Sequence, residues 1–479
     1  MGDADRELVG RLEARIKALE DLVAQQAALI AAQAKRIADL EAELARYKRN
    51  SSNSSKPPSS DIVKPPKSPP PKGKGKRKIG GQPGHKRHER AAFPAERVDE
   101  VITHTLESCP KTGRRLKKSG RPPRVLQQVG LVEKPFVVRE HRCEAYWCEA
   151  CGKIHYAGLP QDVRAGGLFD AGFTALIAYL KGTHHMSYTN VQRYLKDVMD
   201  LDASRGHLVD TVHEVGDALA APYAELEHAL PGEKRVNVDE TGHHDNGKLW
   251  WTWVFNTPRY SLFRIIDSRG SKVLVDTLGS DFDGVLGCDY FGAYRKYMKD
   301  FAVLVQFCLA HLIREVKFLA EHPDKPTAAW GVRLREALRE LFGVIHRRDK
   351  MTPHGFVREL QKARRVALKR GTTRVPESNE AQKLAKRLRR HGAAYFTFIT
   401  TPGIDPTNNV AERAIRFIVI DRRITQGTRG ARGRVWCERI WTAIATCAQQ
   451  GRSAFRFLAD AVSAHFAGAR APSLMPSGP

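Results

Sequence analysis

Three acidic residues, Asp239, Asp289 and Glu412, occupy positions where their carboxylates could bind metal ions. Asp239 ends the alternating run RVNVD, which predicts a β-strand, and Asp289 ends GVLGCD, a pattern typical of a buried strand. Two strands that each deliver an Asp to the carboxyl edge of one sheet produce the geometry of a metal site. Glu412 lies in PTNNVAERAIRFIVIDRR, a predicted helix that begins near Thr407 or Asn408.

Such carboxylates suit Mg²⁺, which prefers oxygen ligands and keeps open positions for water and phosphate oxygens. Two such ions roughly 3.5–4 Å apart can activate an attacking oxygen and stabilise a leaving 3′ oxygen, so no covalent nucleophile is required. The three residues are unequally spaced, and the chain has 53 Asp and Glu residues. Three unrelated carboxylates therefore stay the alternative.

The chain of 479 residues has a formal net charge of +26, from 79 Lys and Arg against 53 Asp and Glu. This excess attracts phosphate backbones or anionic lipid. The sequence shows no lipid anchor, no run of about 20 apolar residues that would span a membrane, and no signal-peptide core in MGDADRELVG. We therefore expect a cytoplasmic, nucleoid-associated protein that binds DNA and no membrane.

Residues 5–48 repeat apolar side chains every seven residues. β-Branched residues at the a positions, among them Ile16, Val23 and Ile30, with mainly Leu at d favour a parallel coiled coil. We expect this coiled coil to form a homodimer or a larger oligomer. A helix that packs on its own chain is the alternative.

Residues 49–90 change to Pro, Ser and Lys, a composition that cannot bury enough apolar surface to fold. We expect a disordered basic linker. Residues 48–90 carry a net charge of +11, which suits a DNA backbone, although a solubilising tether explains it equally well.

Residues 91–160 predict a small zinc-finger-like β module. The alternating runs VDEVITHTL and KPFVVREHRC predict strands, and CEACGK contains a CxxC turn. The candidate ligands for a structural Zn²⁺ are Cys109, Cys143, Cys148 and Cys151. His141 or His155 are alternatives for the fourth ligand, and Thr112 stands where a second CxxC would have Cys, so a finger held by packing alone stays open.

Residues 161–230 have a helical period, with Ser187 and Ser204 at predicted N-caps. Short helices in a basic protein suggest a helix-turn-helix-like DNA-binding region that presents Arg205 and His207 to a groove. Ordinary packing of three helices is the alternative.

Residues 231–440 predict a mixed-sheet catalytic domain, because KLWWTWVFNT and YSLFRIID continue the first strand as a meander. Residues 322–400 are Arg-rich and helical in period, which predicts a helical insertion that can lie over DNA. Residues 441–479 predict a C-terminal helix and tail. The fold class is therefore multidomain α/β.

Taken together, NVDETGHH, GVLGCDYFGAY, QFCLAHLIREVKFL, TPGIDPTNNVAERAIRFIVIDRR and ITQGTRGARG resemble the transposases of the insertion sequence 66 family. SSNSSKPPSSD, GGQPGH and the cysteine module extend the resemblance over almost the whole chain. It implies an RNase H-like fold of the DDE type with an insertion before the catalytic Glu. It also implies that Asp239, Asp289 and Glu412 hold two Mg²⁺, with Mn²⁺ as a substitute.

The resemblance further implies roles for residues around the triad. Cys308 and His311 match the family's C-x-x-H pair, for which helix packing is an equally good interpretation. The polar helix around the Glu matches at four residues that we expect to contact DNA, Asn408, Asn409, Arg413 and Arg416. Companion proteins encoded by the same element are further expected partners.

The sequence thus predicts a DNA transposase that cuts the ends of an insertion element and joins them to target DNA. One alternative is a catalytically inactive, dimeric DNA-binding protein or regulator derived from such an element. Another is a structure-selective nuclease on the same fold, which would share the hydrolysis but not the joining.

Overall fold

A computed structural model describes residues 3–47, 92–117, 121–129, 132 and 135–476. The predicted linker therefore lies outside the described residues. The chain divides into two units, Pro66–His141 and a larger one that contains Arg142–Pro479 together with Met1–Pro65. Helix α1 (Asp3–Tyr47) belongs formally to the larger unit.

The larger unit is built on a mixed β-sheet in the order β5-β4-β3-β6-β7. Its strands are β3 (Arg235–Asp245), β4 (Lys248–Asn256), β5 (Ser261–Ile266), β6 (Val285–Cys288) and β7 (Leu304–Phe307). β3, β4 and β5 form an antiparallel meander, whereas β3, β6 and β7 run parallel to one another. The predictions of a meander and of a mixed α/β fold are confirmed.

β3 is longer than the sequence pattern predicts, because it continues past Asp239 to Asp245. Its pairing with β6 ends at Asn237, but its pairing with β4 continues through the hairpin turn. Asn246 and Gly247 both have positive φ in this turn, the backbone that a two-residue Asn-Gly hairpin requires. Asp239 thus lies at the end of the parallel pairing and not at the end of the strand.

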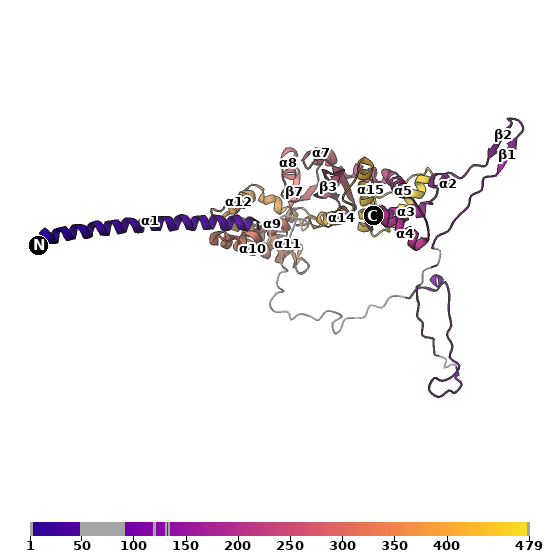
Figure 1. The fold of residues 1–479 in the computed structure, drawn as a ribbon, viewed down its shortest axis with the longest axis horizontal. Coiled ribbons are helices and arrows are strands. Elements are labelled where there is room, and N and C mark those ends of the chain that lie inside the picture. The colour runs from indigo at the N-terminus through magenta and orange to yellow at the C-terminus, as the bar shows by residue number, and fades with distance from the viewer. Residues whose placement is uncertain (1–2, 48–91, 118–120, 130–131, 133–134, 477–479) are drawn as a thin grey trace. The chain divides into compact units, whose positions relative to one another are not determined.

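The helices around the sheet follow the predicted order (Figure 1). Those before it are α2 (Gln161–Gly166), α3 (Ala171–Gly182), α4 (Tyr188–Met199), α5 (Arg205–Ala218) and α6 (Ala220–Ala229). Those within and after it are α7 (Lys272–Leu278), α8 (Gly292–Phe301), α9 (Leu309–Ala320), α14 (Asn409–Thr425), α15 (Ala431–Gln449) and α16 (Ala454–Phe466). The predicted insertion is helical, with α10 (Lys325–Ile345), α11 (Pro353–Thr372), α12 (Asn379–His391) and α13 (Thr397–Thr400).

Two N-caps predicted for the first helices are confirmed. Ser187 Oγ accepts from the backbone N–H of Asn190, and Ser204 Oγ accepts from that of His207. The segment Gln161–Gly182 is apolar and long enough to cross a membrane by length and composition. It forms two helices: α3 packs against α5 and α16 and has buried residues, whereas α2 has none.

Helix α15 covers the edge of the sheet at β5. Alternate backbone N–H groups of β5 donate to side chains that are four residues apart on α15, which occupies the hydrogen-bonding edge that would otherwise be unpaired. The pairs are Ser261 to Thr446 at 3.2 Å, Phe263 to Thr442 at 3.0 Å and Ile265 to Glu438 at 2.5 Å. Helix α15 also packs against α5 and continues past residue 440, the predicted end of the catalytic domain. The helical region of residues 161–230 and the sheet therefore form one packed body.

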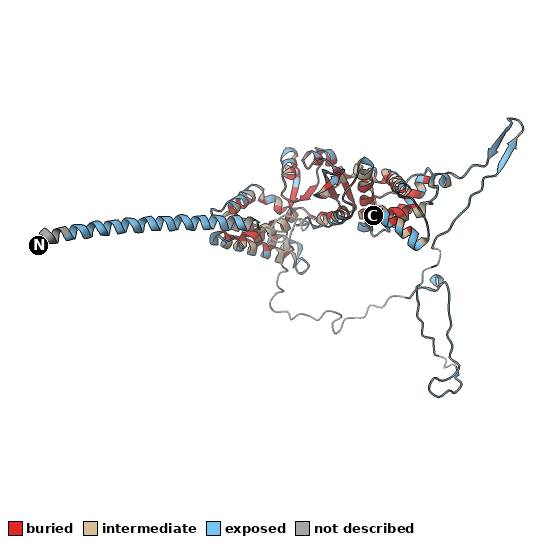
Figure 2. Cartoon of the chain, viewed as in Figure 1, coloured by how far each residue is buried: buried red, intermediate tan, exposed pale blue. Residues whose placement is uncertain are grey.

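The helix predicted over residues 5–48 is confirmed as α1, and its described side chains are exposed (Figure 2). They include Ile16, Val23 and Ile30, which are 55%, 64% and 65% exposed.

The β module is smaller than predicted. The larger unit contains one hairpin from it, β1 (Ala145–Cys148) and β2 (Lys153–Tyr156). The described parts of the runs VDEVITHTL and KPFVVREHRC contain no strand, so the strands predicted there were wrong. Their apolar residues are exposed, Val101 to 82% and Val137 to 69%, because no sheet partner or core covers them.

Candidate active site

Asp239 lies on β3, and Asp289 directly follows the neighbouring strand β6. The parallel register pairs Asn237 with Gly287, so continuing it by two residues places Asp239 beside Asp289. Parallel strands lie about 4.8 Å apart, and positions two residues apart point to the same face of the sheet. Both aspartates are half-buried. The sequence prediction that two strands deliver an Asp to one place is thus supported by the register.

Asn237 connects this pair to the helix that carries Glu412. Its side-chain amide donates to Asn408 Oδ1 at 2.8 Å, and Asn408 Nδ2 donates to the carbonyl of Val238 at 2.8 Å. A Cβ on Gly287 would approach Asn237 Nδ2 to 2.3 Å, so only glycine leaves room for this amide. The N-terminus of α14 is therefore fixed to β3 next to Asp239.

Asn408 occupies the predicted N-cap position of α14 but does not cap the helix. Its side chain is used by β3 instead, and the residue is only 2% exposed. The expectation that Asn408 contacts DNA is therefore not supported. Sequence reasoning missed Asn237, although a polar residue inside the apolar run RVNV was an available signal.

Helix α9 holds the other side of the Glu412 turn. Cys308 N donates to the carbonyl of Cys288 at 2.8 Å, next to Asp289. Cys308 Sγ accepts from Asn408 N at 3.2 Å. Burial raises the pKa of Cys308, so it is a neutral thiol that bridges the second Asp strand and the Glu helix.

Two further side chains of α9 surround Glu412. Arg314 Nη2 donates to Glu412 Oε1 at 3.1 Å, whereas His311 Nδ1 lies 3.5 Å from the same oxygen and makes no hydrogen bond. Burial, together with the Arg314 cation, lowers the pKa of His311 to about 4, so its imidazole is neutral at pH 7. Arg314 is the ion-pair partner of Glu412. Cys308 makes two backbone hydrogen bonds outside its own helix, and the ligand atoms of Cys308, His311 and Glu412 lie within 4.8 Å of one another.

The cluster concentrates negative charge in a partly dry site. Burial, with the nearby Glu240, Asp289 and Glu412 carboxylates, raises the pKa of Asp239 well above its ordinary range. Burial and then Glu240 raise the pKa of Asp289 to about 7. A divalent cation would reverse both effects because it supplies the missing positive charge. The residues present therefore fit a divalent metal ion.

Glu240 is the neighbour of Asp239 but belongs to a separate ion pair. Its side chain is 2% exposed, lies 2.7 Å from Arg269 Nη2 and accepts from the hydroxyl of Tyr294. The Arg269 guanidinium stacks between the rings of Trp251 and Phe291, at 4.5 and 3.9 Å from their centroids. Glu240 thus has its own ion-pair partner, whereas Asp289 feels Arg269 only as a weaker, more distant charge that lowers its pKa.

A groove of about 420 Å³ opens in front of Glu412. It is lined by three of the predicted DNA contacts, Asn409, Arg413 and Arg416. All three side chains are exposed, and their spacing along α14 places them on one side of the helix. The structure thus brings these cationic and polar groups to the groove that Glu412 lines.

The two residues of the helical region that were predicted to contact DNA, Arg205 and His207, differ in their exposure. Arg205 is exposed at the first position of α5. The His207 ring packs on Phe169, with 5.0 Å between the centroids, and is half-buried. Arg205 is therefore available to a ligand, whereas His207 serves packing.

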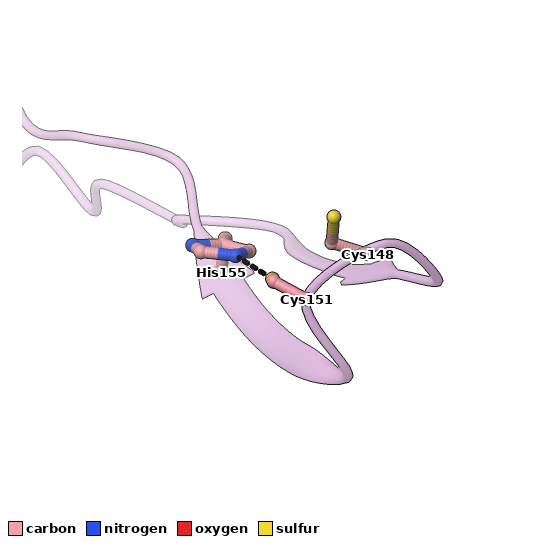
Figure 3. Close-up of side chains that lie close together, drawn as sticks. All are labelled: Cys148, Cys151 and His155. Carbon is pink, nitrogen blue, oxygen red and sulfur yellow. Dashed lines mark hydrogen bonds between the residues drawn. The ribbon is translucent and has the colours of Figure 1, made fainter.

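The candidate zinc residues come together only in part. Cys148, Cys151 and His155 have ligand atoms within 4.8 Å of one another on the β1–β2 hairpin (Figure 3). The Cys151 thiol lies 3.1 Å from His155 Nε2, and hydrogen bonds to the Cys151 turn lower the pKa of Cys148. Cys143 does not belong to this cluster, and Cys109 lies in the other unit. His155, one of the two histidine alternatives, takes the third position.

The Cys109 turn nevertheless repeats the Cys148 turn. The N–H of Gly113 donates to the Cys109 carbonyl at 2.8 Å, and that of Gly152 donates to the Cys148 carbonyl at 2.9 Å. Both glycines have positive φ, +67° and +61°. Each turn thus has the backbone of a CxxCG knuckle, and Thr112 replaces the second thiol of the first one.

Comparison with protein families gives two matches. Residues 166–435 match the model of the Transposase IS66 family, and residues 5–91 match a family of unknown function, DUF6444. The first match includes the whole sheet, the helical insertion and all three candidate carboxylates. No curated protein matches the chain.

Proposed function

Because the family match covers more than half of the sequence, the chain belongs to the IS66 transposase family, and we propose that it is an active DNA-cutting and DNA-joining enzyme. Membership implies that it acts on DNA and suggests a divalent metal requirement. The proposal is supported by the β3–β6 register, which brings Asp289 next to Asp239 when it is continued by two residues, and by Asn408, which ties the start of the Glu412 helix to β3.

We assign Asp239, Asp289 and Glu412 as the residues that hold the metal. Two Mg²⁺ or Mn²⁺ ions bound there would supply an activated oxygen nucleophile and charge stabilisation for the leaving 3′ oxygen. The first reaction is hydrolysis, in which water attacks a phosphodiester at the element end and the bond to the 3′ oxygen breaks. In the second, the freed 3′-OH attacks a target phosphodiester and displaces its 3′ oxygen.

The chain's own groups act on the DNA strand around this centre. Arg413 and Arg416 face the groove and would bind the phosphates on either side of the reacting one, with Asn409 donating to an oxygen. Arg314 holds the Glu412 side chain in place by its hydrogen bond until metal ions bind. Cys308 connects the start of the Glu412 helix to β6, because its thiol accepts from Asn408 N and its own N–H donates to the Cys288 carbonyl.

The finer fold assignment is an RNase H-like core with a helical insertion. It is supported by the topology, in which three antiparallel strands are followed by two parallel ones, with the first strand in the centre of the sheet. We propose that residues 5–48, 49–90 and 91–160 are separate segments, whereas residues 161–230, 231–440 and 441–479 are regions of one packed body. Residues 161–230 are proposed to bind DNA in a helix-turn-helix-like way through Arg205. A transposase acts on cellular DNA, so we place the protein in the cytoplasm with the nucleoid.

We further propose that α1 pairs protomers as a coiled coil, so that two DNA ends are held together. The exposed apolar seam supports this assignment. Replacing Ile16, Val23 and Ile30 by Asp is expected to abolish end pairing, measured as the loss of an early-eluting complex in gel filtration and of a slowly migrating band in native gels. Retained pairing would remove the dimer proposal, and companion proteins of the same element would then be sought as the pairing partners.

Cleavage of end-containing DNA by Asp289→Ala tests the catalytic assignment. We expect the variant to lose Mg²⁺-dependent strand cleavage and to keep its DNA affinity. Asp283→Ala is the matched control, because Asp283 is an exposed aspartate that pairs with Lys234 just before β6. Cleavage that survives in Asp289→Ala would contradict the assignment.

The same assay separates the other candidate functions. A wild-type chain that binds DNA but cuts none with Mg²⁺ or Mn²⁺ would be a regulator derived from an element. A chain that cuts but yields no joined donor–target product would be a nuclease on the same fold.

A further inference from the structure

A second cavity, of about 570 Å³, lies at the opposite end of α14 from Glu412. Its walls come from α3, α4 and α5, from the last turns of α14 and from the glycine-rich loop that leads into α15. Asp421, which lines it, is roughly 14 Å from Glu412 along the helix axis. The proposed chemistry makes no use of this cavity.

The cavity carries an excess of positive charge. Lys181, Arg429 and Arg432 line it, and both arginines are exposed. Its carboxylate, Asp421, is already engaged by His185 Nδ1 at 3.0 Å. The nearest acid of Arg432 is the exposed Asp217 at 3.9 Å, a weak contact in water. An anion that enters therefore meets uncompensated cations.

The loop before α15 is held in one conformation by β3. Thr428 N donates to the His244 carbonyl at 2.9 Å, and Gly430 N donates to Asp245 Oδ1 at 2.8 Å. Gly427 has φ +89°, and a Cβ there would lie 2.0 Å from the His244 carbonyl oxygen, so only glycine fits. α15 then begins without a side-chain cap, which adds the positive end of a 19-residue helix to the arginines.

The inner wall of the cavity is apolar and aromatic. Tyr188, Trp436 and Trp441 line it together with Val209, and His213 adds a ring whose Nδ1 is buried without a partner. A phosphate on the surface of a duplex would require neither this depth nor this lining. Aromatic walls beside cations are the features that bind an unpaired base together with its phosphate.

We propose that this cavity binds one unpaired nucleotide of the DNA strand that leads to the catalytic groove, with its phosphate at Arg429 and Arg432. The base would enter the aromatic wall formed by Tyr188 and Trp436. The position, roughly 14 Å along α14 from Glu412, corresponds to about four nucleotides of a strand. The inference rests on the DNA binding of the family but adds a site outside the catalytic groove.

Fluorescence anisotropy with two probes tests the proposal on the full chain. The probes are a 30-base-pair duplex and the same duplex with one unpaired thymidine at its centre. We expect wild type to bind the second probe about tenfold more tightly, and Arg429→Ala/Arg432→Ala to lose this preference. The double variant should also lower the slope of log affinity against log salt by about one, as for one lost phosphate contact.

Arg456→Ala/Arg470→Ala is the matched control, because it removes two exposed arginines elsewhere in the larger unit. It should keep the preference for the unpaired nucleotide. Equal binding of the two probes by wild type, or an unchanged preference in Arg429→Ala/Arg432→Ala, would overturn the proposal. Asp289→Ala should keep the preference, so a failure of the catalytic proposal is distinguishable from a failure of this one.

Photocrosslinking supplies an independent measurement. A duplex that carries unpaired 5-iodouracil is expected to crosslink to the peptide that contains Tyr188 or the one that contains Trp436. Crosslinks only to α14 residues of the catalytic groove would place the unpaired base elsewhere and contradict the proposal.

Discussion

Replacing Asn408 tests whether a buried amide positions the catalytic glutamate. Asn408 donates to the Val238 carbonyl and accepts from Asn237, both at 2.8 Å, and is 2% exposed. Asn408→Ala would leave the Val238 carbonyl and the Asn237 amide without partners in a dry site. Each unsatisfied buried group costs about 1–3 kcal/mol, so for these two groups we expect a loss of roughly 2–6 kcal/mol in the free energy of unfolding.

The effect on cleavage should exceed what instability alone produces. Without Asn408 the first turn of α14 loses its attachment to β3, and Glu412 follows on that same turn. A displacement of about 1 Å at a catalytic group lowers the rate about 100-fold. Cleavage is to be measured at a temperature where urea titration shows the variant fully folded.

Asn409→Ala is the matched control, because Asn409 is the adjacent residue, has the same side chain and is exposed. Its free energy of unfolding should change by less than about 0.5 kcal/mol. A folded Asn408→Ala protein that cuts DNA at the wild-type rate would refute the positioning argument, whatever its stability.

Three further predictions follow from the charges of the molecule. Burial raises the pKa of Asp289 to about 7, so Mg²⁺ binding should release protons and the Mg²⁺ affinity should rise from pH 6 to pH 8. Calorimetry in buffers of different ionisation enthalpy measures both effects, and an affinity that does not change with pH would contradict the prediction. Burial raises the pKa of Glu438 to about 7, so its ionised form destabilises the folded state at high pH, and this penalty disappears as the pH falls towards the lower pKa of the unfolded chain. Glu438→Gln should therefore raise the free energy of unfolding by up to about 3 kcal/mol at pH 8 and leave it unchanged at pH 4, as measured by urea titration. Cys148→Ser should remove any Zn²⁺ bound with Cys151 and His155, read by metal analysis of the purified protein, and equal zinc in wild type and variant would exclude the hairpin as the site.

The sequence could predict the parts of the site that follow local rules. Strand patterns predicted β3, which contains Asp239, and β6, which Asp289 directly follows. Ser187 and Ser204 cap helices as their residue types indicate. Asn408 stands at the N-cap position of α14 as its residue type indicates, but its side chain does not cap the helix, because β3 offers it partners that no local pattern reveals. Tertiary hydrogen bonding outweighed the local preference there.

The strands predicted for the cysteine module show that a local pattern can also predict an element that does not form. Alternation in VDEVITHTL supplies an apolar face, but a strand forms only where another strand or a core accepts that face. In the described residues, Val101 and Val137 have neither. The CxxCG turns persist without such support because each is closed by its own backbone hydrogen bond and a glycine with positive φ.

The unequal spacing of the three carboxylates has a structural explanation in how the insertion is attached. Leu309 N donates to the Pro406 carbonyl at 2.9 Å, and Cys308 accepts from Asn408 N, so the segment that leaves the core at α9 returns to it at the same point. A segment whose ends are already joined can be long or short at little entropic cost to the core. Helices α10–α13 therefore separate Asp289 from Glu412 in sequence while the hydrogen bonds at their base keep Glu412 at the sheet edge. The position of the catalytic glutamate thus depends on the contacts of Cys308, Leu309 and Asn408 and not on the length of chain between the strands and α14.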